Sequence, residues 1–278
     1  MNKYDFERKE WLNPDTIEFS NDYEKALYQK HLKPYHIVKN ELNGLNVLEI
    51  GCGAGYGLEI IHSYAEMITT VDIDESSLTY AQNKYDQPNI NFIHADILEG
   101  IKFEDNSFDY VISFQVIEHF THKNVKKYLS EIQRVLKPGG KAFFTTPNRN
   151  TRLLPGQKPI NTYHPTEYSK KSLERLLNKT FESVEIFGLK SSSEIEAMFF
   201  TRKNQTYFRA FILKPIRNLI YNISRQLKLK SIKNILDKRS KYSRPKKQFK
   251  DQVIDENQFF VVTENIDNSI DLYARCNN

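Results

Sequence analysis

The chain has 278 residues, of which 39% are hydrophobic and 13% aromatic, and it carries 40 lysines and arginines against 35 acidic residues. A chain of this size and composition can bury the core of one large domain, or of one domain with an appendage. Its longest uninterrupted apolar stretches, such as 197–200 and 259–262, have four residues, far fewer than the roughly 20 of a membrane-spanning helix, so no transmembrane segment is expected.

The amino terminus and the cysteines indicate the compartment. No apolar run follows the charged residues at the amino terminus, so no secretory signal is expected. Cys52 and Cys276 are too few for a disulfide framework or a cysteine-rich zinc site, which fits a reducing compartment. The sequence therefore predicts a cytoplasmic protein.

Residues 1–45 are predicted to form a helical leader that can act as a lid. Asn21 or Asp22 can cap a helix, and apolar side chains recur after it at helical spacing. These side chains are Tyr23, Leu27, Tyr28, Leu32, Tyr35 and Val38.

Residues 46–196 alternate between short apolar runs and longer amphipathic stretches, which is typical of strands and helices alternating around a parallel sheet. The predicted strands are 47–50, 68–73, 90–94, 108–114, 141–146 and 184–187, and the predicted helices are 57–64, 75–85, 123–136 and 169–178. The predicted fold class is therefore α/β, with a doubly wound, mostly parallel sheet that binds ligands beyond the carboxyl ends of its strands.

The segment 197–250 has a different composition. It contains sixteen lysines and arginines and one acid, Asp237, a net charge of +15, while the remaining 24 basic and 34 acidic residues give −10. Apolar residues recur in it at helical spacing, as in a basic amphipathic helix. They include Ile212, Ile216, Leu219, Ile220, Ile223 and Leu227. Strand-like runs at 259–262 and 270–276 follow, so we predict a helical insertion, after which 251–278 completes the sheet with a final hairpin.

The strongest motif is Val-Leu-Glu-Ile-Gly-Cys-Gly-Ala-Gly-Tyr-Gly at 47–57. Alternating glycines after a buried strand let the backbone turn tightly and approach a ligand before a helix begins, although an ordinary strand-to-helix turn is also conceivable. A dinucleotide fingerprint beginning at Gly51 would need glycine where Tyr56 stands, which disfavours a nicotinamide enzyme. With its E-x-G-x-G-x-G pattern, this motif resembles that of the class I S-adenosylmethionine-dependent methyltransferases, in particular their type 11 branch.

Four further motifs follow in the order that this resemblance implies. Asp72 ends the second predicted strand, Asp96 ends the third, 108–119 is similar to the fourth-strand motif and 134–140 to the turn before the fifth strand. The resemblance covers roughly residues 45–190 and implies a Rossmann-like, seven-stranded fold with S-adenosyl-L-methionine as cofactor. It also implies a set of cofactor-binding residues, namely Glu49, Gly51, Gly53, Gly55, Asp72, Ile73, Asp96, Ile97, Phe114 and Gln115.

Asp72 has two competing interpretations. A carboxylate at the end of the second strand, about 20 residues after the glycines, can accept both ribose hydroxyls of a nucleoside cofactor. It can also cap the helix that begins near Ser76 or Ser77. Asp74 competes for the ribose, and Asp72 is favoured because it lies nearer the strand end.

Methyl transfer from a sulfonium is an in-line displacement, so alignment lowers most of the barrier and a base is needed when the acceptor is a hydroxyl or a protonated amine. His119 follows the fourth strand, where the resemblance implies the methyl group, and imidazole suits a base near neutral pH. Glu118 can orient or replace it, and His164 is a second candidate. The alternative is that His119 only packs in a loop. The spacing of the other histidines predicts no metal site.

The residues at 146–177 resemble type 11 enzymes of glycan and cell-envelope biosynthesis, which implies a small-molecule or glycan acceptor methylated at oxygen. An RNA methyltransferase is the alternative function. The Asn/Asp-Pro-Pro-Tyr/Phe signature that holds a flipped base is missing, which argues against methylation of adenine or cytosine amino groups.

Three interpretations remain for the basic segment 197–250. A lid over the active site is favoured, and peripheral association with an anionic membrane comes next. Nucleic-acid binding comes third because aromatic residues are sparse after Tyr221.

Overall fold

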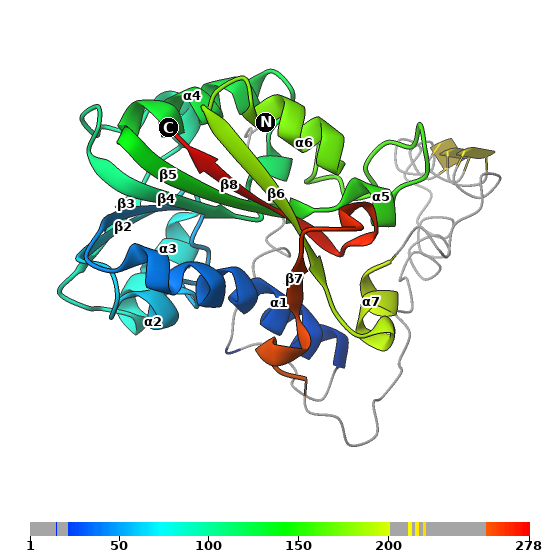
Figure 1. Ribbon diagram of the computed structural model, residues 1–278, viewed down its shortest axis with the longest axis horizontal. Helices are drawn as coiled ribbons and strands as arrows, with labels where there is room; N and C mark the ends of the chain where they lie inside the picture. Colours follow the sequence, from blue (N-terminus) through cyan, green and yellow to red (C-terminus); the bar gives the residue numbers. More distant parts are fainter. Residues whose placement is uncertain (1–14, 16–21, 201–210, 213–214, 217–218, 221–253) are drawn as a thin grey trace.

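An eight-stranded sheet forms the centre of the molecule (Figure 1). The computed structural model describes residues 15, 22–200, 211–212, 215–216, 219–220 and 254–278. The strands follow one another across the sheet in the order β3-β2-β1-β4-β5-β8-β6-β7. They are β1 (Asn46–Ile50), β2 (Met67–Asp72), β3 (Ile90–His94), β4 (Phe108–Phe114), β5 (Leu136–Pro147), β6 (Ser183–Lys190), β7 (Phe260–Val262) and β8 (Asp271–Asn277).

The order and direction of the strands confirm a doubly wound α/β fold. The first five strands pair in parallel, whereas β8 lies antiparallel between β5 and β6, and β7 pairs antiparallel with the outer side of β6. The sheet thus has eight strands rather than the expected seven. The expected final hairpin is wrong, because β7 and β8 lie on opposite sides of β6 and do not pair with each other.

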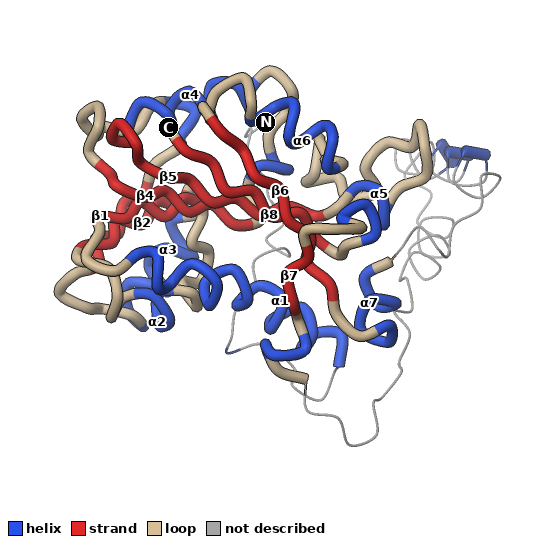
Figure 2. Tube along the Cα trace, viewed as in Figure 1, coloured by secondary structure: helices blue, strands red, loops and turns tan. Residues whose placement is uncertain are grey.

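Helices cover both faces of the sheet, with α1, α2 and α3 on one face and α4 and α6 on the other (Figures 1 and 2). The α-helices are α1 (Asp22–Val38), α2 (Leu58–Ile61), α3 (Glu75–Lys84), α4 (Asn124–Val135), α5 (Arg149–Arg152), α6 (Lys170–Leu177) and α7 (Ser193–Phe199). The 3₁₀ helices are η2 (Lys39–Leu42), η3 (Ile97–Glu99), η4 (Ile117–His119), η7 (Glu256–Gln258) and η8 (Ile266–Asn268).

Two buried clusters hold these layers together. Successive side chains of a strand point to opposite faces, so Leu48 and Val111 belong to the cluster under α4 and α6, whereas Val47 and Tyr110 belong to the one under α1 and α2. The helix α4 contributes a buried stripe at helical spacing to the first cluster. This stripe consists of Val125, Tyr128, Leu129, Ile132 and Val135.

The residues Lys137–Gly140, expected to form a turn, lie inside β5. Gly139 has a φ of 75°, and a Cβ on Gly140 would lie 2.8 Å from the carbonyl oxygen of Lys137. The register between β4 and β5 shifts between Phe108 and Tyr110. The Pro-Gly-Gly sequence therefore forms an irregularity within the strand, whereas the local pattern alone resembles the end of a helix.

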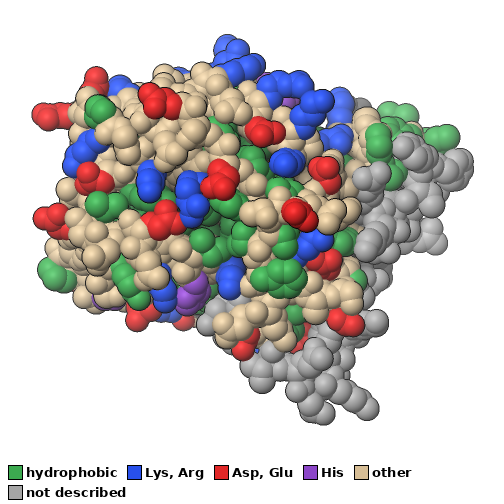
Figure 3. Space-filling model, viewed as in Figure 1, with side chains coloured by type: hydrophobic (Ala, Val, Ile, Leu, Met, Phe, Trp, Pro, Cys, Tyr) green, Lys and Arg blue, Asp and Glu red, His purple; other side chains and the backbone are tan. Residues whose placement is uncertain are grey.

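Most of the basic segment 197–250 lies outside the described residues, so the predicted amphipathic helices stay predictions. The boundary expected at 196/197 falls within α7. Phe200, at the end of α7, is buried, whereas the large apolar residues described between 211 and 220 are exposed, namely Phe211, Ile212, Ile216, Leu219 and Ile220. Among the described residues, no helix is long and apolar enough to cross a membrane. Figure 3 shows charged side chains of both signs interspersed on the face in view.

Candidate functional site

The backbone turns sharply at Gly51, directly after β1. Gly51 has a φ of 81°, and its N–H donates to the carbonyl oxygen of Val71 in β2 at 2.7 Å. A Cβ at this position would lie 2.5 Å from Cγ2 of Val116, which follows β4. Glycine is required here because any other side chain would be strained at this φ and would collide with Val116.

Asp72, at the end of β2, joins the glycine loop that follows β1 to the loop that follows β2. Its Oδ2 accepts the N–H of Gly53 at 2.8 Å, and its Oδ1 accepts the N–H of Asp74 at 2.9 Å. The pKa of Asp72 is raised, mainly by burial. The cap of α3 is Asp74 instead, which accepts the N–H groups of Ser76 and Ser77, both at 2.9 Å. The structure thus separates the two interpretations of Asp72, since the capping role belongs to Asp74.

Asp96 and Ile73 lie beside Asp72 at the same edge. The N–H of Ala95 donates to the carbonyl oxygen of Asp72 at 3.1 Å, which places the end of β3 next to the end of β2. Asp96 accepts the N–H of Leu98 at 2.8 Å and caps η3. Ile73 is 49% exposed, whereas Ile97 is buried. Three predicted cofactor residues, Asp72, Ile73 and Asp96, therefore come together at one edge.

Glu49 is buried in β1 and bonded within the protein. Its Oε1 accepts the hydroxyl of Tyr35 in α1 at 2.6 Å, and its Oε2 accepts the hydroxyl of Thr70 at 3.2 Å. Burial raises the pKa of Glu49 to about 7, against the lowering effect of these two hydrogen bonds. The structure therefore shows Glu49 joining the leader helix to the sheet, while its contact with a cofactor stays a prediction.

This carboxyl group should make stability depend on pH. The folded-state pKa of about 7 lies above the ordinary value of 4.5. The contribution of the Glu49 carboxyl group to the free energy of unfolding is therefore fully present below about pH 4.5. It is lost as the pH rises through 7, and this loss is on the order of 3 kcal/mol. We expect the free energy of unfolding of the wild type to fall by this amount relative to Glu49→Gln between pH 5 and pH 8. Urea unfolding at several pH values measures the difference.

A matched control for this experiment is Glu99→Gln, which removes an exposed carboxyl group of η3. Its unfolding free energy should stay parallel to that of the wild type over the same pH range. Parallel curves for Glu49→Gln and the wild type would contradict the assignment of a buried, protonatable carboxyl group to position 49.

Aromatic side chains of α1 and the glycine loop pack over the end of β4. The Tyr35 ring meets the Phe114 ring edge-on with 4.8 Å between centroids. A Cβ on Gly57 would lie 2.0 Å from the Tyr35 ring, so the last glycine of the motif makes room for the leader helix. His31 in α1 lies with Nδ1 3.2 Å from the hydroxyl of Tyr56. The leader helix thus packs directly on the glycine motif.

Gln115 follows β4 with a φ of 58°, which is unusual for a residue other than glycine. Its Nε2 donates to Oγ1 of Thr145 and to Oδ2 of Asp271, both at 3.1 Å. The same Asp271 oxygen lies 2.5 Å from Nζ of Lys30 in α1, and both side chains of this ion pair are buried. The predicted cofactor residue Gln115 is therefore held by groups from β5, β8 and the leader helix.

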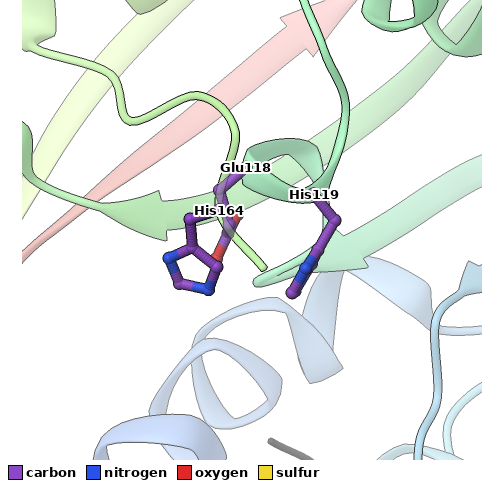
Figure 4. A group of neighbouring side chains, drawn as sticks. All are labelled: Glu118, His119 and His164. Carbon is purple, nitrogen blue, oxygen red and sulfur yellow. The ribbon is translucent and has the colours of Figure 1, made fainter. Parts of the chain in front are cut away.

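Glu118, His119 and His164 gather beyond the carboxyl ends of β4 and β5, and Figure 4 shows their side chains pointing to the same side. The two imidazole rings meet edge-on with 4.9 Å between centroids. Each residue offers one ligand atom, and these three atoms lie within 4.8 Å of one another. The structure thus brings together all three predicted catalytic residues.

Neighbouring groups orient His119 and Glu118. Nδ1 of His119 lies 3.0 Å from the carbonyl oxygen of Tyr163. Because a carbonyl only accepts, Nδ1 carries the hydrogen in this contact and Nε2 has the lone pair. Oε2 of Glu118 accepts the hydroxyl of Thr146 at 2.9 Å, and burial raises the pKa of Glu118. The exposed His119 can therefore accept a proton or a metal ion through Nε2.

A pocket of about 440 Å³ with walls of mixed polar and apolar character adjoins this cluster. Thr166 and Glu167 line it, and they also link it to the cluster, since the N–H of Thr166 donates to the carbonyl oxygen of Glu118 at 3.4 Å. Oε1 of Glu167 lies 3.8 Å from Nδ1 of His164 and 3.2 Å from Nε of Arg152. The segment that carries His164 thus forms both a wall of the pocket and a part of the cluster.

Lys30, Thr146 and Asp271 are the residues of this site that the sequence interpretation missed. Asp271 and Lys30 are separated by 241 positions. One local signal was available, because Lys30 lies four residues from both Ala26 and Pro34, on the buried side of α1. A lysine in an apolar stripe indicates a buried partner.

Comparisons with known proteins agree with this geometry. Residues 48–144 match a family model described as a methyltransferase domain, of type 11. The chain is 34% identical over 168 residues to a "Probable S-adenosylmethionine-dependent methyltransferase" of Mycolicibacterium smegmatis, a match that covers 60% of this chain and 63% of the relative. It is 31% identical over 131 residues to a ubiquinone biosynthesis O-methyltransferase of Coxiella burnetii, covering 43% and 55%. The matches thus span less than two thirds of either relative.

A solved structure supports the fold over most of the chain. A methyltransferase of Archaeoglobus fulgidus that depends on S-adenosylmethionine superposes with a TM-score of 0.54 at 17% identity, covering 91% of this chain and 94% of the other. At this level of identity, the likeness concerns the arrangement of helices and strands.

Proposed function

We propose that this chain transfers the methyl group of S-adenosylmethionine to a hydroxyl group of a small molecule or glycan. The match of residues 48–144 to a methyltransferase family model of type 11, and the likeness to an S-adenosylmethionine-dependent methyltransferase, support this proposal. The observation that carries the hydroxyl assignment is His119, which presents the lone pair of Nε2 beyond the end of β4. A relative named as an O-methyltransferase supports it as well.

The glycine loop and the ends of β2 and β3 form the proposed cofactor site. Asp72 accepts the ribose hydroxyls, since a carboxylate has about four lone-pair positions and the N–H groups of Gly53 and Asp74 do not fill them. Asp96 and the N–H of Ile97 bind the adenine edge, with Ile73 beside them. The backbone can approach the cofactor closely at Gly51, Gly53 and Gly55. The proposed cofactor site is completed by Phe114 and Gln115 at the end of β4.

In the proposed reaction, the acceptor oxygen attacks the methyl carbon while the bond from this carbon to sulfur breaks. The sulfonium becomes a neutral thioether, and the hydroxyl proton passes to Nε2 of His119 and then to solvent. Binding supplies the alignment, and general-base catalysis contributes about 10²- to 10⁴-fold. In this proposal, Glu118 orients the imidazole of His119, and the ring of His164 packs against that imidazole from the adjoining loop.

We propose an acceptor side that comprises the pocket that adjoins the cluster, the leader helix α1 and the segment 197–250. The pocket offers Arg149, Asn150 and Ser169 to a hydroxylated acceptor. These three polar side chains can hydrogen-bond to a glycan or to another hydroxylated small molecule. We also propose that the leader 1–45 and the basic insertion 197–250, which lie partly outside the described residues, cover the domain 46–196, and that residues 251–278 complete its sheet.

The proposal is tested by incubating the full chain with S-adenosylmethionine labelled in its methyl group and with fractions of a cell extract. We expect label in a small-molecule or glycan fraction, with the methyl carbon bound to oxygen in the NMR spectrum of the product. Label in RNA would support the alternative, an RNA methyltransferase that uses the +15 charge of 197–250. A methyl group on nitrogen or carbon of the product would contradict the hydroxyl assignment.

A further inference from the structure

We propose that Glu118, His119 and His164 bind a divalent transition-metal ion. The proposal concerns the acceptor side of the site in which we place the methyl transfer, and only the role of the ion depends on that proposed function. The starting observation is the convergence of one carboxylate and two imidazoles, whose ligand atoms lie within 4.8 Å of one another, from two segments far apart in the chain.

The contacts around His119 are those of a metal ligand. A ligating histidine donates its other ring N–H to a carboxylate or carbonyl group, which fixes the tautomer and the ring orientation. His119 makes this contact through Nδ1 with the carbonyl oxygen of Tyr163 at 3.0 Å. Its Nε2 is thereby left as the ligand atom. Oε1 of Glu167, 3.8 Å from Nδ1 of His164, is suited to the same role for the second histidine.

Glu118 supplies an independent reason to expect a cation. Its side chain is 1% exposed, and Oε2 accepts one hydrogen bond from Thr146. Oε1 is buried and has no hydrogen-bond partner among the described residues. A buried carboxylate oxygen without a partner is costly. A metal ion between Glu118 and the two histidines would satisfy this oxygen.

The ligand set indicates which ions fit. Imidazole suits zinc, iron, copper and nickel, whereas magnesium and calcium prefer an all-oxygen set. Two histidines and one carboxylate therefore favour Zn²⁺ or Fe²⁺. Ligand atoms around a tetrahedral zinc ion lie roughly 3.4 Å apart. The widest separation in the cluster must then close by up to about 1.4 Å from the 4.8 Å observed, which rotations of the side chains can provide.

Three protein ligands leave a position of the ion open for an oxygen of the acceptor. The ion and the general base exclude each other at one atom, because Nε2 of His119 cannot ligate a metal and accept a proton. With the ion bound, the acceptor hydroxyl binds to it and its pKa falls. The hydroxyl proton then passes to a water molecule, and the resulting oxygen attacks the methyl carbon as the carbon–sulfur bond breaks.

The test uses the full chain without an affinity tag, stripped of metal, and Co²⁺ as a probe. We expect one equivalent to bind, with visible d–d absorption of a site with nitrogen and oxygen ligands, and Zn²⁺ to displace it in calorimetry. His119→Ala, His164→Ala and Glu118→Gln should each weaken Co²⁺ binding at least 10-fold. The control His62→Ala removes a histidine at the end of α2, outside the cluster, and should leave binding unchanged.

No binding of Co²⁺ or Zn²⁺ by the wild type would overturn the proposal, as would binding that all three cluster variants retain. Three separate variants keep the test decisive if one of them fails to fold. S-Adenosylhomocysteine binding, measured on the same samples, separates the two proposals. Cofactor binding without metal binding would leave the methyltransferase proposal standing and refute the metal site. Metal binding without cofactor binding would leave the metal site standing and refute the methyltransferase proposal.

Discussion

Replacement of Asp72 by alanine is expected to weaken the binding of S-adenosylhomocysteine by about 10²- to 10⁴-fold. Two hydrogen bonds from the ribose to a charged group account for this loss, at about 1.5–3 kcal/mol each. The substitution also frees the N–H groups of Gly53 and Asp74, so the glycine loop loses its tie to β2. Isothermal titration calorimetry measures the change in affinity.

Asp74→Ala is the matched control for this experiment. Asp74 lies two residues away and competes with Asp72 for the ribose in the sequence, but in the structure it caps α3. Its loss should lower the free energy of unfolding by about 1 kcal/mol and leave the affinity for S-adenosylhomocysteine unchanged. The opposite pattern, with Asp74→Ala defective in binding and Asp72→Ala normal, would show that the ribose lies on Asp74.

Replacement of His119 by alanine is expected to lower kcat by about 10²- to 10⁴-fold, the range that general-base catalysis contributes. The ring is exposed and lies beyond β4, so its removal should leave the fold and the affinity for S-adenosylhomocysteine intact. Methyl transfer to the acceptor found in the labelled fraction measures kcat, and calorimetry measures cofactor affinity.

His62→Ala, outside the cluster, should keep the wild-type kcat in the same assay. Turnover of His119→Ala at the wild-type rate would remove His119 from the mechanism, whether as base or as metal ligand. A parallel fall of kcat and of cofactor affinity would instead assign His119 to cofactor binding.

The parallel half of the fold could be predicted from the sequence because its signals are local. A buried strand followed by alternating glycines specifies a tight turn wherever it occurs, and the structure places Gly51 at a positive φ there. Apolar runs at Ile90–His94 and Phe108–Phe114 gave strand ends that agree with the structure residue for residue. Asp96 follows two residues after the end of β3, and Asp72 ends β2, one residue before the predicted strand end.

The antiparallel half of the sheet could not be predicted in the same way, because pairing across it is not local. The runs at 259–262 and 270–276 have strand composition, but nothing in them specifies that β6 lies between β7 and β8. The pairing of β8 with both β5 and β6 places the apolar side chains of β8 in the core. Leu272, Ala274 and Cys276 are accordingly buried against the cluster under α4 and α6.

The candidate site also combines residues that local sequence signals predict with an arrangement that is not local. The sequence singled out His119 and His164 separately, each from its position after a predicted strand. Their edge-on contact at 4.9 Å depends on how the loop after β4 and the loop after α5 meet in space. The hydrogen bond from Nδ1 of His119 to the carbonyl oxygen of Tyr163 and that from the hydroxyl of Thr146 to Glu118 depend on this spatial arrangement as well. The individual side chains were therefore predictable, and their assembly into one cluster was not.

A crystal structure of the chain with bound S-adenosylhomocysteine tests the central claim most directly. We predict the ribose hydroxyls on Asp72, the adenine beside Asp96, and the sulfur atom facing His119 across the end of β4. A cofactor bound with its ribose on other groups, or with its sulfur directed away from Glu118, His119 and His164, would contradict this account.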